Sequence, residues 1–153
     1  MLDRAINGLI AGAVGTALLN VTTYLDMLIR ARPSSSVPAQ TAERLTDLGD
    51  VSLAGKDEET KPRRTAAGAL MGYVAGLGIG TAYGLTEDAV PDLPLPLSAG
   101  IVGIAAMVAS DLPATASGAT DPRKWNVGSW LADIVPHFAY GLGTVAVYRL
   151  LRG

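Results

Sequence analysis

Four long apolar stretches dominate the chain, and most charged residues gather in the segments between them. The stretches cover residues 5–29, 65–85, 97–116 and 127–151. Each has roughly the 20 residues that a helix needs to cross a bilayer. The pattern predicts an all-α membrane protein with four transmembrane helices, forming a single domain over residues 1–153. The alternative is a soluble, glycine-rich bundle, and the absence of any charge in residues 65–85 argues against it.

Glycine recurs at every fourth position of the second stretch, at Gly68, Gly72, Gly76, Gly80 and Gly84. This spacing places all five on one face of a helix. In water each interior glycine costs about 1 kcal/mol relative to alanine. In a bilayer, small residues let a neighbouring helix approach closely. We expect this face to pack tightly, together with a shorter one formed by Gly8 and Gly12 on the first helix.

Two pairs of segments indicate an internal duplication. AGAVGTA at residues 11–17 matches AGIVGIA at 99–105 in five of seven positions, and GLGIGTAY at 76–83 shares its GLG start and final tyrosine with GLGTVAVY at 141–148. The first and third helices would then be copies, as would the second and fourth. Two helices per copy imply a parallel repeat with a pseudo-twofold axis along the membrane normal. Chance similarity between segments rich in glycine and alanine is the alternative.

The connecting segments differ in length and charge. Residues 30–64 are long and polar, and within them Ser36 is placed to cap a short helix whose Val37, Leu45 and Leu48 would face the membrane or the end of the bundle. Residues 86–96 are short and acidic, and residues 117–126 carry Arg123 and Lys124.

The basic residues predict the orientation. Residues 30–64 and 117–126 together hold nine of the twelve Lys and Arg. The positive-inside rule places both loops in the cytoplasm and both termini outside. We expect a multi-pass protein of the inner membrane. Its first stretch should remain in the mature chain, because Asp3 interrupts the basic region that a signal peptide would have.

Ionisable residues inside membrane segments are expensive and are therefore candidates for function. Asp133 and His137 are four residues apart on one helix face, beside Pro136, which frees a backbone carbonyl. The remaining polar residues expected in the same inner half of the bundle are Asp111, Asp26 and Asn20. One interpretation is a site for protons or cations. The other is structural: these groups pair with neighbours such as Arg30 and hold helices together.

Composition narrows the remaining possibilities. A net charge of −2 argues against nucleic acid as a partner. The absence of cysteine excludes disulfides and thiolate chemistry. The sequence contains no Ser/His/Asp order, metal-ligand spacing or phosphate-binding loop, so we expect no enzyme activity, no metal and no cofactor.

The HFAYGLG segment of the last stretch resembles the final helix of YagU-like inner-membrane proteins, and GLIAGAVGTAL is similar to their first helix. The resemblance covers about forty residues. It implies a small multi-spanning protein of the inner membrane and supplies no catalytic residue.

Three classes of function remain open. The first is a structural or accessory membrane protein whose glycine faces bind copies of itself or partner subunits. The second is a small oligomeric transporter or channel that uses the Asp/His cluster. A membrane enzyme is the third, and the sequence favours it least.

Overall fold

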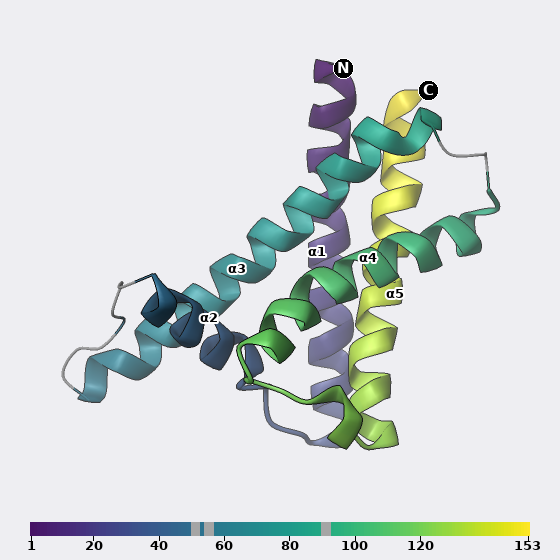
Figure 1. Cartoon of the computed structure of the whole chain (residues 1–153). Coiled ribbons are helices and arrows are strands. Elements are labelled where there is room, and N and C mark those ends of the chain that lie inside the picture. The colour runs from purple at the N-terminus through teal and green to yellow at the C-terminus, as the bar shows by residue number, and fades with distance from the viewer. Residues whose placement is uncertain (50–52, 54–56, 90–92) are drawn as a thin grey trace.

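The structure is a computed structural model, and it describes residues 1–49, 53, 57–89 and 93–153. Within these residues all regular structure is helical (Figure 1). The five α-helices are α1 (Leu2–Arg30), α2 (Val37–Leu48), α3 (Asp57–Thr86), α4 (Leu95–Ala116) and α5 (Val127–Arg152). Two short 3₁₀ turns, η1 (Glu87–Ala89) and η2 (Pro122–Lys124), lie in the connections. The all-α prediction is confirmed.

Only three of the described helices are long and apolar enough to cross a membrane, which corrects the expected four. They are Leu2–Arg30, Glu59–Ala89 and Leu95–Ala116. α5 has the length, since 26 residues rise about 39 Å. It is not apolar enough, because Asp133, Pro136 and His137 interrupt its first half and Arg149 interrupts its second half.

α3 starts earlier in the chain than the apolar pattern predicted. The apolar pattern placed the helix start at residue 65, but α3 begins at Asp57. Its first turns are charged and continue the helix beyond the apolar segment. Glu59 and Arg63 lie one helical turn apart, and the salt bridge of 3.0 Å between them stabilises these turns.

The short helix expected after Ser36 is present as α2. Ser36 occupies the N-cap position, but its hydroxyl makes no capping bond and instead accepts from the Gln40 amide at 2.8 Å. α2 packs against α3 through its buried Thr41 and Ala42. Leu48 is 80% exposed, so it does not contact the bundle as one interpretation expected.

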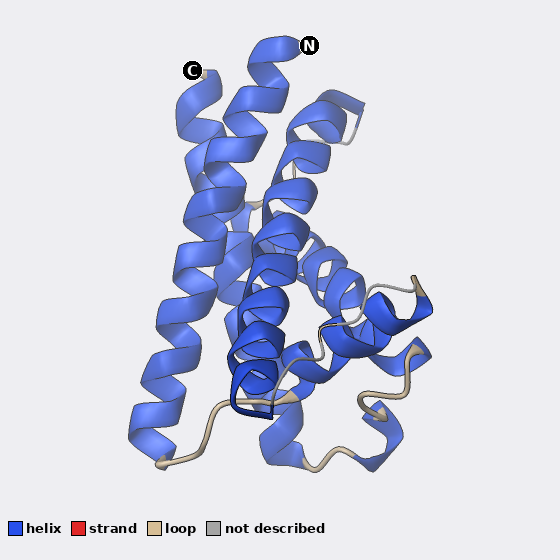
Figure 2. Ribbon diagram, turned by 90° about the vertical axis from the view of Figure 1, so that its left-hand side faces the viewer, coloured by secondary structure: helices blue, strands red, loops and turns tan. Residues whose placement is uncertain are grey.

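α1 and α5 form the centre of the molecule, packing against each other in opposite directions (Figures 1 and 2). α3 packs on α1, and α4 packs on α5. α3 and α4 contact each other much less. Both termini therefore lie at one end, and the loops before α2 and before α5 lie at the other (Figures 1 and 2).

The glycine faces pack inside the chain. A Cβ added at Gly8 would lie 2.5 Å from the carbonyl oxygen of Gly80, and one at Gly12 would lie 2.7 Å from that of Gly76. Gly84 faces Gly8 in the same way, at 2.9 Å from its Cα. The backbones of α1 and α3 therefore meet without side chains between them.

The other two glycines of the α3 face have different surroundings. A Cβ at Gly68 would lie 2.6 Å from the carbonyl carbon of Pro38 on α2, whereas one at Gly72 would meet nothing within 4 Å among the residues that the structure describes. α3 is thus covered by α1 towards its C-terminal end and by α2 nearer its N-terminal end. Between these two contacts the helix is uncovered at Gly72.

The same mode of packing occurs at interfaces that the glycine pattern did not single out. A Cβ at Gly103 on α4 would meet the carbonyl oxygen of His137 on α5 at 2.6 Å. A Cβ at Gly143 on α5 would meet Leu18 at 2.6 Å and the Cα of Gly15 at 3.3 Å, both on α1. Small residues therefore bring α5 close to both of its neighbours.

Large aliphatic side chains cover the outside of the bundle. Residues such as Leu70, Val74, Ile104 and Leu112 are 60 to 72% exposed. A soluble protein rarely exposes so much contiguous apolar surface. The three apolar helices and this surface identify a membrane protein.

Candidate functional site

Three of the five predicted polar residues meet where α4 packs against α5. His137 and Asp133 lie one turn apart on α5, with the imidazole Nδ1 2.8 Å from the carbonyl oxygen of Asp133 and 3.3 Å from its carboxylate Oδ1. Asp111 on α4 lies within electrostatic range of both. The helix pair therefore assembles a cluster of two carboxyl groups and one imidazole.

A fourth member, Ser110, was missed by the sequence analysis. Its hydroxyl lies 3.4 Å from Nε2 of His137 across the α4–α5 interface. A neutral serine next to an aspartate gives no signal of its own. The duplication pattern could have found it, because pairing the third and fourth stretches as a hairpin brings residues 110 and 137 to similar depth.

The cluster is largely enclosed. The side chains of His137 and Asp133 are 13% and 19% exposed. Oδ2 of Asp133 is buried and has no hydrogen-bond partner among the described residues. An imidazole between a hydroxyl and a carboxylate can take up or release a proton at either ring nitrogen.

Ser110, His137 and Asp133 are also the three residue types of a serine hydrolase triad. The geometry does not support this chemistry. The Ser110 hydroxyl donates to the carbonyl of Met107 at 2.9 Å, which turns it away from the imidazole. Both residues lie within continuous helices, whose own hydrogen bonds use the backbone N–H groups that an oxyanion hole would need.

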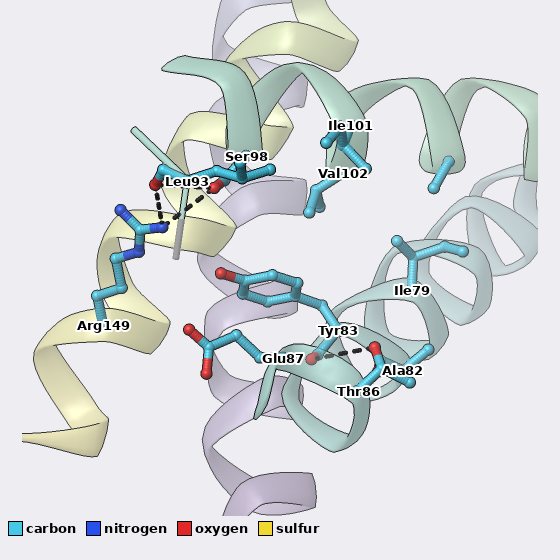
Figure 3. Close-up of a pocket in the computed structure, with 11 residues that line it drawn as sticks. Ile79, Ala82, Tyr83, Thr86, Glu87, Leu93, Ser98, Ile101, Val102 and Arg149 are labelled. Carbon is cyan, nitrogen blue, oxygen red and sulfur yellow. Dashed lines mark hydrogen bonds between the residues drawn. The ribbon is translucent and has the colours of Figure 1, made fainter. Parts of the chain in front are cut away.

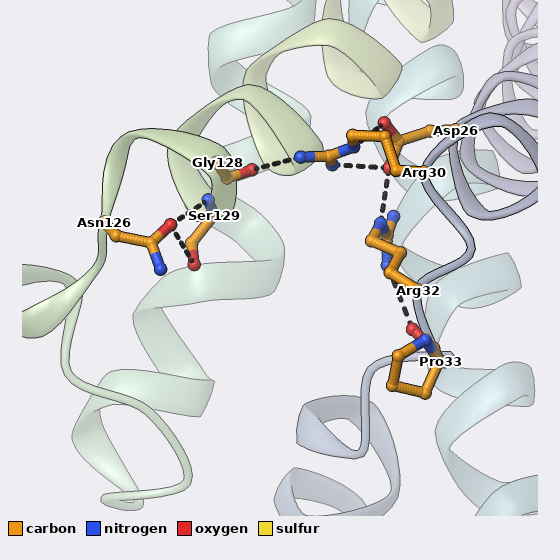
Figure 4. A network of polar contacts seen from close by, with 7 residues as sticks. All are labelled: Asp26, Arg30, Arg32, Pro33, Asn126, Gly128 and Ser129. Atoms are coloured by element: carbon orange, nitrogen blue, oxygen red, sulfur yellow. Dashed lines mark hydrogen bonds and ion pairs between the residues drawn. The ribbon is translucent and has the colours of Figure 1, made fainter.

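Asp26 does not join the cluster. Its carboxylate lies 2.5 and 2.6 Å from two guanidinium nitrogens of Arg30 and also pairs with Arg32 (Figure 4). Arg30 in turn donates to the carbonyl of Gly128 at the start of α5, at 3.2 Å. Asp26 therefore pairs with two arginines at the end of α1, and Arg30 connects this end to α5.

Asn20 also lies apart from the cluster. Its side chain is half-buried on α1 and makes no hydrogen bond to the described residues. A cleft of about 230 Å³ lies nearby between α1 and α5, lined by Thr22, Asp26, Arg30, Leu131, Val135 and Pro136. The cleft thus borders Pro136 and Asp26, and its lining includes neither Asp111 nor His137.

Local bonds fix the loop that leads into α5. Asn126 caps the helix by accepting from the Ser129 N–H at 2.8 Å (Figure 4). Asp121 accepts from the Arg123 guanidinium at 3.0 Å, and this bond lowers the pKa of the Asp121 carboxyl. The loop therefore holds the start of α5, and with it Asp133, in a defined position.

Among the described residues no group of three or more His, Asp or Glu side chains is arranged to hold a metal ion. No protein-family model, curated protein or solved structure matches the chain. The resemblance to YagU-like proteins and the functional interpretations therefore stay predictions.

Proposed function

We propose that this chain is a small integral membrane protein with a structural or accessory role, which binds a copy of itself or a partner subunit within the bilayer. The observation that carries the proposal is the uncovered middle of α3. A Cβ at Gly72 would meet no atom of the described residues within 4 Å, although Gly68 and Gly76 on either side of it are buried. Leu70, Tyr73 and Val74 beside it are 50 to 72% exposed.

This proposal changes which glycines would serve the partner. Gly76, Gly80 and Gly84 are occupied by contacts within the chain, as are Gly8 and Gly12. Of the five glycines spaced four apart on α3, only Gly72 is left open by the described residues, and a small residue that is left open permits another helix to approach the backbone.

Two glycine substitutions separate partner binding from folding. Gly72→Leu should shift the protein in nanodiscs from an oligomer or complex to a monomer, with an unchanged melting temperature. Gly76→Leu should destabilise the fold by about 3 kcal/mol or more, because it overpacks the buried α1–α3 contact. Leu77→Ala is the control for both variants.

Light scattering and mass spectrometry of the purified nanodiscs give the readout. A monomeric wild-type protein without a co-purifying subunit would contradict the proposal. So would a Gly72→Leu variant that keeps its partner.

We further propose that α5 crosses the membrane as the fourth helix. It packs between α1 and α4, so its polar residues face protein more than lipid. Helices covered by neighbours tolerate such residues. Four crossings with residues 30–64 and 117–126 in the cytoplasm put both termini outside, which is the orientation that the basic residues favour.

The duplication stays a prediction with support from part of the structure. α1 packs on α3 and α4 on α5 through small residues, as two copies of one hairpin would. The pseudo-twofold axis would also relate the α1–α5 contact to one between α3 and α4. That second contact is much smaller.

Proton or cation transfer through the α4–α5 cluster is the second candidate, and it is favoured by the convergence of Asp111, Asp133 and His137. His137→Ala and Asp133→Asn should abolish proton- or cation-dependent flux in proteoliposomes without lowering the melting temperature. If the cluster is structural, the same variants should melt earlier because they leave a buried partner unpaired. Wild-type liposomes without flux would exclude transport, and unchanged melting would exclude the structural role.

A further inference from the structure

The limited contact between α3 and α4 leaves a cleft of about 210 Å³ (Figure 3). Its walls are mainly apolar and come from both helices, with Ile79, Ala82 and Tyr83 on α3 and Ile101, Val102 and Ala105 on α4. The cleft opens to the outside of the bundle, where Ile101 is 50% exposed. In a bilayer this opening faces the lipid acyl chains.

Polar groups gather at one end of the cleft. The Glu87 carboxylate and the Arg149 side chain line this end, and the Tyr83 ring reaches towards them (Figure 3). Arg149 donates to the Leu93 carbonyl at 2.8 Å and to the Ser98 hydroxyl at 3.0 Å. These residues lie at the end of α3, the start of α4 and the last turn of α5, at the level expected for lipid headgroups.

One carboxylate oxygen of Glu87 lacks a hydrogen-bond donor among the described residues. The residue is 8% exposed, and its Oε1 pairs with Arg152. Its Oε2 is buried without a hydrogen-bond partner among the described residues. A buried charged oxygen without a donor is costly, so a ligand that brings an N–H group to this position would be stabilised.

The charges lining the cleft match those of a zwitterion. Among the described lining residues, Glu87 is the acidic one and Arg149 the basic one. An ammonium group supplies three N–H donors for a carboxylate, and a phosphate is a strong acceptor for a guanidinium.

The size of the cleft also favours a lipid. Its volume lies below the ~300 to 1,000 Å³ of sites that enclose a small molecule. A drug-sized or larger ligand would therefore have to extend outside the protein. An acyl chain does so, because the rest of the lipid remains in the bilayer.

We propose that the cleft between α3 and α4 binds a phospholipid with a primary-amine headgroup. One acyl chain lies along Ile79, Ile101 and Val102, the phosphate lies towards Arg149, and the ammonium donates to Oε2 of Glu87. This inference rests on the chain being a membrane protein, but not on the proposed partner contact at Gly72.

The first test uses the wild-type protein. Phosphatidylethanolamine, its N-methyl and N,N-dimethyl forms, and phosphatidylcholine are titrated into the detergent-solubilised full chain, and bound lipid is counted by native mass spectrometry. Affinity should fall along this series by about tenfold in total, since a charge-assisted hydrogen bond is lost when the last N–H is methylated. Equal affinities across the series would overturn the proposal. Tighter binding of phosphatidylglycerol would also overturn it, because positive charge alone would then select the lipid.

Three variants locate the site. Glu87→Gln should remove the preference for phosphatidylethanolamine over phosphatidylcholine. Ala105→Trp should fill the apolar part of the cleft and weaken both lipids. Ile104→Trp is the matched control, because Ile104 is exposed and does not line the cleft. Lipid binding that Ala105→Trp leaves unchanged in a folded protein would place the lipid elsewhere and contradict the proposal, whether or not Glu87→Gln folds.

Discussion

Two tyrosines on α5 bridge to α3 at matching intervals. Tyr140 donates to the carbonyl of Gly76 at 2.6 Å, and Tyr148 donates to that of Gly84 at 2.9 Å. The donors are eight residues apart on one helix, as are the acceptors on the other. Each tyrosine is 1% exposed. Because the acceptors lack side chains, a phenol can reach the α3 backbone directly.

Tyr140→Phe should lower the free energy of unfolding by about 1 kcal/mol, since the phenyl ring still fills the space and only the hydrogen bond is lost. Tyr24→Phe, at a tyrosine that is 63% exposed, should change little. Denaturant titration of both variants in the same detergent compares them. Equal stability of Tyr140→Phe and wild type would show that the bridge contributes nothing to the fold.

The sequence predicted the charged residues, which are costly to bury in a membrane, more reliably than the hydroxyl residues, which complete contacts between helices. Asp133, His137 and Asp111 were found because a charge in an apolar stretch is conspicuous. Ser110 and Tyr140 were not assigned their contacts, because a hydroxyl is tolerated in many positions and its partner depends on which helices meet. The glycine spacing predicted a closely packed face, but not that its middle would stay uncovered at Gly72.

The helices differ in how fully the chain itself explains them. α1 and α4 are mainly apolar, and their bounds lie close to those that the apolar pattern predicted. The start of α3 was missed because charged residues before an apolar stretch look the same in a loop and in a helix that extends into water. The polar residues of α5 are covered by neighbouring helices. Hydropathy, which ignores such neighbours, therefore gives α5 a low score as a membrane-spanning helix.

α2 is held against α3 near Gly68. It contacts α3 where a Cβ at Gly68 would strike the backbone of Pro38, and Glu43 pairs with Arg64. Gly68→Leu should release α2 while the α1–α3 contact stays intact. Hydrogen exchange should then speed up in residues 37–48 and remain slow in residues 76–84. Gly78→Leu is the control, since a Cβ at this α3 glycine would meet no described atom within 4 Å. Unchanged exchange in α2 would show that it is not held through Gly68.

At the scale of the whole molecule, the ends of the chain are fastened to the connection between α3 and α4. Arg4 of α1 pairs with Asp88, and Arg152 of α5 pairs with Glu87. Both acidic residues belong to η1. The termini and this connection therefore lie together, while the loops before α2 and α5 lie at the opposite end. This arrangement is simplest if α5 crosses the bilayer beside α1.

The most direct test of this arrangement is the side of the membrane on which the C-terminus lies. The chain has no cysteine, so Ser35→Cys, Ala89→Cys and Gly153→Cys each introduce a single thiol. In intact cells, a membrane-impermeant maleimide should label the cysteines at positions 89 and 153 and leave position 35 unlabelled until the cells are opened. Labelling of position 89 with position 153 shielded like position 35 would mean that α5 does not cross the bilayer, and would contradict the four-helix arrangement.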